Sequence, residues 1–349
     1  MKFKYKFPAV RGIQAKREYY VAMIPLGLLE KLFSENEDIT SPEFRAQRRL
    51  NEQRIPEISN YILTNRDTYV FSALSASIDG KFEFIPYTDG DIGELNIDMD
   101  AIYLINDGQH RKAAILSALK EDDTLKTETI SVVFFKDIGL ERSQQMFTDL
   151  NKHAVKPSNS LSILYDSRDP IARLSKEVMN KVEFFKKFTD KEKTNLGKNS
   201  SKLFTLTYLY KAIQRLIKNH YDQSQDEFVI DYWKNVAENI VEWQEVLNKK
   251  LYKKDLREDY IITLSITLIA LGRLGSYFYE NQNIDMKKSL QKLQKIDWNR
   301  DNELWLKRII REDGKVKNNE EAIVLTCNAI KKELGIKLSK EELLKEKRI

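Results

Sequence analysis

Ile102-Tyr103-Leu104-Ile105-Asn106-Asp107-Gly108-Gln109-His110-Arg111 is the stretch that decides the fold of the first half of this chain. Four apolar residues are followed by the polar segment Asn106 to Arg111, and the next residues, Lys112 to Lys120, have a helix-forming composition. An apolar run of this kind predicts a strand buried on both faces, and Asn106-Asp107-Gly108 predicts the turn that starts a helix. The polar segment is therefore expected between the carboxyl end of a strand and the N-terminus of a helix.

Such a position favours an anion, because free backbone N–H groups and the helix dipole meet there. Arg111 can bind a phosphate through two hydrogen bonds, and His110 can donate a hydrogen bond or move a proton. Asp107, Gly108, Gln109, His110 and Arg111 together are our predicted phosphate- or nucleotide-binding site. A simpler interpretation stays open: Asp107 is the helix N-cap, paired with Arg111, and His110 is an ordinary surface group.

The pentad Asp107-Gly108-Gln109-His110-Arg111 resembles the signature of the DGQHR-domain family, and within it the DndB group of DNA sulfur-modification proteins. Seven further blocks follow the same pattern: Phe7–Gln14, Arg45–Arg48, Arg54–Ile58, Tyr69–Leu74, Arg142–Phe147, Asp149–Ala154 and Lys202–Leu206. The resemblance is dense over about residues 5–215 and thin after that. A pentad alone arises by chance, but an ordered series of blocks does not.

The resemblance implies a DNA-binding negative transcriptional regulator of the genes that place phosphorothioate linkages in DNA. It implies DNA upstream of its own gene cluster as a partner and leaves open contacts with other sulfur-modification proteins, a homo-oligomer, and a nucleotide as cofactor. It also implies distant similarity to the ParB/sulfiredoxin fold, in which a comparable turn at a helix N-terminus holds a nucleotide phosphate.

The composition is that of a globular protein, with 42% hydrophobic and 32% charged residues in 349. One cysteine, Cys327, excludes an internal disulfide, and three histidines leave too few ligands for Cys/His zinc sites. The most apolar segment, Ile261 to Leu271, is too short to span a bilayer. Without a signal peptide, we expect a cytoplasmic protein with no membrane contact and no bound metal.

Charge is uneven along the chain, whose net value is +5. Residues 1–160 carry 21 Lys and Arg against 24 Asp and Glu, which leaves 37 against 29 for the remainder. A polyanion would therefore meet a basic second half, although helical proteins often carry a solvated lysine-rich surface.

We predict an α+β fold: a mixed-sheet ParB/sulfiredoxin-like domain over residues 1–165, then an all-helical domain over 166–349. In the first half, strands are expected around Lys2–Phe7, Tyr69–Ile78 and Thr129–Phe135, and a hairpin at Asp79-Gly80. The Asp- and Gly-rich segment Tyr87–Asp100 predicts a loop, and Lys156–Asp169 the connection between domains. Helices are expected at 43–63, broken near Pro56, and at 141–154, and six more after Pro157: 171–188, 203–219, 228–247, 255–280, 286–296 and 320–333.

Two basic groups are further candidates for contact with DNA phosphates. Arg45, Arg48 and Arg49 share one face of the expected helix, with Arg54 nearby, and the plain alternative is an exposed helix paired with glutamates. The run 181–202 holds seven lysines, among them Lys191, Lys193 and Lys198, and its Asn, Gly and Ser content predicts a mobile basic loop or a solvated linker. Asn151 and His153 are expected to support the pentad from the next helix, or to cap that helix.

The alternative function is an enzyme that hydrolyses nucleotides or phosphodiesters. Arg111 and the helix N-terminus would stabilise charge on phosphorus, His110 would act as general acid or base, and Asp107 would orient it or hold an ion. A lone aspartate is a poor metal site, and the sequence has no phosphate-loop, dinucleotide-binding or nucleophile-elbow motif. A helix-turn-helix-like pair near 320–345 is a weaker candidate for DNA contact.

Overall fold

The computed structural model describes residues 3–33, 50–137, 139–152, 157–197, 200–218 and 221–347, and it divides the chain into two compact units. The first, residues 1–155, is called the sheet unit, and the second, residues 156–349, the helical unit. The predicted boundary after residue 165 lies ten residues beyond this division. The reason is that the expected connection folds as helix α5 (Asn159–Tyr165), which packs against α6 and α8 of the helical unit.

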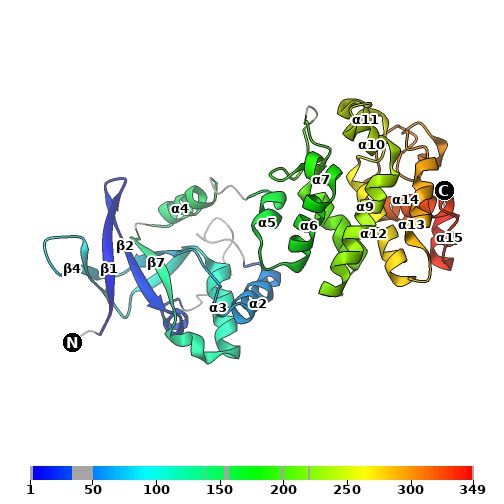
Figure 1. Ribbon diagram of the computed structural model, residues 1–349. Helices are drawn as coiled ribbons and strands as arrows, with labels where there is room; N and C mark the ends of the chain where they lie inside the picture. The colour runs from blue at the N-terminus through cyan, green and yellow to red at the C-terminus, as the bar shows by residue number, and fades with distance from the viewer. Residues whose placement is uncertain are drawn as a thin grey trace. The chain divides into compact units, whose positions relative to one another are not determined.

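The sheet unit is built on one seven-stranded mixed sheet in the order β4-β5-β1-β2-β7-β3-β6 (Figure 1). All neighbouring pairs are antiparallel except β3 and β7, which run parallel. The strands are β1 (Lys4–Gln14), β2 (Arg17–Pro25), β3 (Leu74–Asp79), β4 (Phe82–Pro86), β5 (Ile92–Asp98), β6 (Ile102–Asp107) and β7 (Thr129–Lys136). The helices are α1 (Leu29–Leu32), α2 (Ile55–Thr64), α3 (Gln109–Glu121) and α4 (Leu140–Lys152), with single turns at Leu26–Leu28, Glu52–Arg54 and Asp123–Thr127.

Helices cover both faces of this sheet. Ile62 of α2 and Ile115 of α3 pack into one core with the inward side chains of the strands, including Ile105. Its neighbour Asn106 points to the other face, because successive strand residues alternate, and there its amide contacts Met146 of α4. The predicted α+β class with a mixed sheet is confirmed, and the likeness to the ParB/sulfiredoxin fold stays a prediction.

Three strand predictions are wrong in detail. β6 is an edge strand with Ile102 54% exposed, not a strand buried on both faces. The hairpin at Asp79-Gly80 does not form, because β6 and β7 pair with β3 while β4 pairs with β5 at the far edge of the sheet. The segment expected as a loop contains β5, whose Leu95 and Ile97 are fully buried between β4 and β1.

The helical unit places its helices around a separate core that contains all four tryptophans, at positions 233, 243, 298 and 305, each fully buried. The helices are α5, α6 (Pro170–Lys181), α7 (Glu183–Phe188), α8 (Leu206–Ile217), α9 (Asp226–Asn239), α10 (Val241–Leu247), α11 (Lys253–Asp259), α12 (Ser265–Glu280), α13 (Met286–Leu290), α14 (Glu320–Glu333) and α15 (Lys340–Glu346). Single turns lie at Gln223–Gln225, Gln291–Lys295 and Glu303–Trp305. No helix among the described residues has the length and apolar content that a bilayer span requires.

The unit is not wholly helical, since β8 (Thr189–Asp190) and β9 (Phe204–Thr205) form a short parallel pair. α7 and β8 lie inside the lysine-rich run 181–202 and β9 follows it, so the prediction of a loop over the whole run is wrong. Buried apolar residues explain the difference, because Phe184, Phe185 and Phe188 anchor the segment in the core.

Candidate functional site

The strand-to-helix turn forms where it was predicted, between β6 and α3. The β3–β6 register shifts between Ser75 and Ala76, so a bulge at the end of β6 precedes the turn. Gly108 is the helix N-cap, with φ +103° and ψ 12°, and no side chain caps the helix there. The alternative that made Asp107 the N-cap is therefore wrong. A left-handed backbone at this point explains why glycine follows the aspartate.

Arg111 lies across this turn and holds it together. Its Nη1 donates to the carbonyl oxygens of Ser72 and Ala73, at 2.6 and 2.7 Å, and to the Ser72 hydroxyl at 2.6 Å. Its Nη2 donates to the Asp107 carboxylate at 2.5 Å. The arginine side chain is only 17% exposed, against 42% for the aspartate. The guanidinium thus ties the first turn of α3 to the segment before β3, as the simpler interpretation of the Asp107–Arg111 pair anticipated.

His110 accepts a hydrogen bond from a segment that is distant in sequence. The backbone N–H of Asn51 donates to its Nε2 at 2.9 Å. Arg54 follows three residues later at the end of a single helical turn, and its side chain is exposed. Of the predicted arginine cluster, Arg54 belongs to the segment whose Asn51 contacts His110, whereas Arg45, Arg48 and Arg49 lie outside the described residues.

The remaining predicted residues fall in different places. Gln109 begins α3 and is half-buried, and Asn151 lies in the last turn of α4 with no description of its side chain. His153 and Lys198 lie outside the described residues. Lys191 and Lys193 are exposed and belong to the helical unit.

Lys187, Lys202 and Lys253 come from separate segments and lie around Phe188. Exposed Lys191 and Lys193 follow β8 in the next turn of the chain, and we call these five lysines the lysine face. The Nζ atoms of Lys187 and Lys253 both lie over the Phe188 ring, 6.0 and 5.9 Å from its centre. Lys202 donates its Nζ to the carbonyl of Lys187 at 2.8 Å. The lysine face is therefore assembled by the fold from α7, the residues before β9, and α11.

The turn that carries Lys191 and Lys193 is fixed by hydrogen bonds. The Asp190 carboxylate accepts the N–H groups of Glu192 and Lys193 at 2.9 and 2.8 Å. The Lys193 carbonyl accepts the Ser160 hydroxyl of α5 at 2.7 Å. Because the backbone is held in this way, the two lysines project from a defined position, and Asp190 is engaged by backbone donors next to them.

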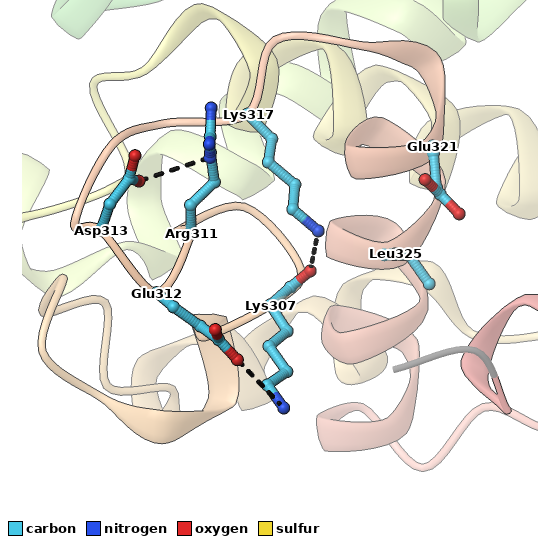
Figure 2. A pocket seen from close by; sticks show the side chains of 7 residues that line it. All are labelled: Lys307, Arg311, Glu312, Asp313, Lys317, Glu321 and Leu325. Carbon is cyan, nitrogen blue, oxygen red and sulfur yellow. Dashed lines mark hydrogen bonds and ion pairs between the residues drawn. The ribbon is translucent and has the colours of Figure 1, made fainter.

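A pocket of about 560 Å³ between the segment 307–317 and α14 has a different character (Figure 2). Its cations are satisfied by their neighbours: Lys307 pairs with Glu312 at 3.4 Å, and Arg311 with Asp313 at 3.3 Å. Lys317 donates to the carbonyl of Lys307. With Glu321 also on its wall, this pocket offers an anion no surplus of positive charge.

Two partners of the pentad were not identified from the sequence. Ser72 and Ala73, whose backbone carbonyls accept hydrogen bonds from Arg111, lie within Tyr69–Leu74. This is one of the sequence blocks that resemble the family, so the sequence did point to this segment. Asn51 carried no signal, because its contribution is a backbone N–H. Across the described ranges, no group of three His, Cys, Asp or Glu side chains is arranged to hold a metal ion.

The described geometry defines a protein of two units, one with a clamped strand-to-helix turn at a sheet edge and one with a basic helical surface. The family model DndB, described as DNA-sulfur modification-associated, matches residues 7–337. The chain therefore belongs to the DndB family, whose members are associated with the sulfur modification of DNA. No curated protein and no solved structure matches it.

Replacing Arg111 by lysine is expected to destabilise the sheet unit by about 1.5–3 kcal/mol, the range for hydrogen bonds to charged groups. A lysine ammonium cannot reproduce the planar fork that reaches Asp107 and both carbonyls at once. Urea unfolding followed by circular dichroism measures the change. The matched control is Arg17→Lys at the exposed start of β2, and equal losses in the two variants would contradict the clamp.

Proposed function

We propose that this protein is a DNA-binding negative transcriptional regulator of the genes for phosphorothioate modification, acting at DNA upstream of those genes. Membership of the DndB family supports the association with DNA sulfur modification. The observation that carries DNA binding is the lysine face of the helical unit, which gathers cations from three segments. Lysines on one surface neutralise backbone phosphates without reading the sequence.

The strand-to-helix turn is proposed as the place where a nucleotide or a DNA phosphate is sensed. Main-chain N–H groups at the start of α3 and the helix dipole favour an anion there. Arg111, held by Asp107 and two carbonyls, would add positive potential and rigidity rather than a bidentate contact. The hydrolytic alternative is not pursued, because Asp107 is engaged with Arg111, and the Nε2 of His110 accepts from the Asn51 backbone.

Removing two charges from the lysine face tests the DNA-binding proposal. In the variant Lys191→Gln/Lys193→Gln, affinity for DNA upstream of the modification genes is expected to fall about 3- to 10-fold at moderate salt. The slope of log affinity against log salt is expected to decrease by about 2, since each phosphate contact contributes about 0.9. Fluorescence anisotropy at several salt concentrations measures both quantities.

The control variant is Lys337→Gln/Lys340→Gln, which removes the same charge from the α14–α15 connection of the same unit. Its affinity and salt slope are expected to stay close to those of the unaltered protein. If the control loses affinity while the lysine-face variant does not, the helix pair near the C-terminus is the interface and the lysine face is not.

A further inference from the structure

Within the helical unit, the connection between α10 and α11 presents an aromatic ring on a basic surface (Figure 1). Tyr252 is 79% exposed, and the segment 248–254 around it contains no acid and four lysines: Lys249, Lys250, Lys253 and Lys254. In the part of the chain that the structure describes, none of these lysines lies at ion-pair distance from an acid. The connection therefore combines an exposed aromatic ring with positive charge that no neighbouring acid neutralises.

Backbone hydrogen bonds fix the shape of this connection. The N–H groups of Lys250 and Leu251 both donate to the carbonyl of Glu245, at 2.8 and 3.3 Å, and the N–H of Leu256 donates to the Tyr252 carbonyl at 3.1 Å. Leu251 packs against the core and Leu256 is fully buried, so apolar anchors lie on both sides of the tyrosine. Because the backbone is already held, little backbone entropy is lost when a ligand contacts the ring.

The same connection continues the lysine face. Lys253 follows Tyr252 directly in the chain, and its Nζ lies 5.9 Å from the centre of the Phe188 ring. The Nζ of Lys187 lies 6.0 Å from the centre of the same ring. A polyanion bound to these two lysines therefore reaches the segment that carries Tyr252.

The other large aromatic residues of the helical unit offer no comparable surface. All four tryptophans are fully buried, so none of them can stack on a ligand. Among the described residues of this unit, Tyr165 is the other aromatic residue with a mostly exposed side chain, at 75%. It is followed by Asp166 and Asp169 with one arginine between them, so its surroundings do not favour a polyanion.

We propose that Tyr252 stacks on an unpaired base while the neighbouring lysines contact the phosphates, so that this surface recognises single-stranded or locally unpaired DNA. The inference rests on the proposed DNA binding and specifies the form of the DNA. Aromatic rings among cations suit single strands, because every base has a flat face and stacking depends little on sequence. In a closed duplex each base face is covered by its neighbours, so a ring at the protein surface cannot reach it.

The variant Tyr252→Ala tests the stacking contact. Tyr252→Phe keeps the aromatic face, and Tyr165→Ala is the control at the other exposed tyrosine. Fluorescence anisotropy compares a short DNA single strand with the closed duplex of the same sequence, at several salt concentrations. A fluorescent base analogue in the single strand, whose emission falls when it stacks, gives a second readout, and thermal unfolding verifies that each variant keeps its fold.

Tyr252→Ala is expected to bind the single strand about 5- to 150-fold more weakly, the range for the loss of one stacked aromatic ring. Its salt slope is expected to stay unchanged, because no charge is removed. Tyr252→Phe and Tyr165→Ala should bind the single strand like the unaltered protein and quench the base analogue equally. Affinity for the closed duplex should change little in any of the three variants.

The proposal is overturned if Tyr252→Ala binds the single strand as tightly as the unaltered protein, or if Tyr252→Phe loses as much affinity as Tyr252→Ala. Equal losses for single strand and duplex would also overturn it, since the ring would then contact a feature common to both. If the unaltered protein binds the duplex and not the single strand, this inference fails and the proposed function stands. If it binds neither, the proposed function fails as well.

Discussion

Replacing Gly108 by alanine is expected to destabilise the sheet unit by about 2–6 kcal/mol, the combined range for backbone strain and overpacking. The backbone φ of Gly108 is +103°, a value that alanine adopts only with strain. A Cβ atom at this position would lie 2.4 Å from Cδ2 of Leu74, which is fully buried at the start of β3. Relief of that clash must move the segment whose carbonyls hold Arg111.

The control for this prediction is Gly139→Ala. Gly139 also has a positive φ, +112°, but its Cβ would meet no described atom within 4 Å. It therefore carries the strain without the clash, and a loss of about 1–2 kcal/mol is expected. Chemical unfolding of both variants, with the helical unit monitored separately by tryptophan fluorescence, makes the comparison. Equal losses would mean that packing against Leu74 contributes nothing.

The strand, turn and helix around Gly108 could be predicted because their signals are local. The apolar run of β6, the glycine and the helix-forming residues of α3 all lie within twenty positions of one another in the chain. The same is true of Pro170, which begins α6 after its N-cap Asp169, as expected for proline in a first turn. Local chemistry determines such elements almost regardless of what they pack against.

Strand pairing could not be predicted, because it depends on competition between distant segments. Asp79-Gly80 has the composition of a hairpin turn, but β3 is enclosed between β6 and β7, which leaves it no edge for β4. In β5, acidic residues at the ends concealed a strand whose Leu95 and Ile97 are needed to fill the core. The sheet order is thus a property of the whole unit rather than of any turn.

The position of the pentad and the pairing of Asp107 with Arg111 could be predicted, but the other contacts of Arg111 could not. The pentad lies at a strand-to-helix turn, yet the partners of Arg111 are backbone carbonyls almost forty residues away, which no side-chain pattern reports.

The C-terminal helix α15 is attached through buried ion pairs, and these lead to the second large expected effect. Lys331 of α14 donates its Nζ to Oε1 of Glu342 at 2.7 Å, and both side chains are only 7% exposed. Arg273 of α12 lies 3.5 Å from the same carboxylate. The other oxygen accepts the N–H of Ser339 and completes a capping box at the start of α15.

Replacing Glu342 by glutamine is expected to destabilise the helical unit by about 3–5 kcal/mol, because one partner of a buried ion pair is removed and the other charge stays buried. The amide oxygen of glutamine can still accept a hydrogen bond from the Ser339 N–H, so the capping box is largely kept. The loss of stability therefore measures the effect of removing the negative charge. Denaturant unfolding at neutral pH measures it. A change below about 1 kcal/mol would show that Lys331 and Arg273 find solvent or other partners.

The double variant Lys331→Met/Glu342→Gln is the matched test, because methionine keeps much of the lysine volume and removes the orphaned charge. It is expected to be more stable than Glu342→Gln alone, and together with the single variant Lys331→Met it completes the cycle that gives the coupling free energy of the pair.

The pH dependence of stability tests the same carboxylate independently. Burial alone would raise the pKa of Glu342, but the hydrogen bonds from Lys331 and Ser339 outweigh it, so the pKa is lowered. The stabilisation is therefore fully present above the unfolded value of about 4.3 and is lost as the pH falls through the lower folded value. The unaltered protein should lose stability more steeply in that acid range than Glu342→Gln, and parallel curves would show that the Glu342 carboxylate is not the group that anchors α15.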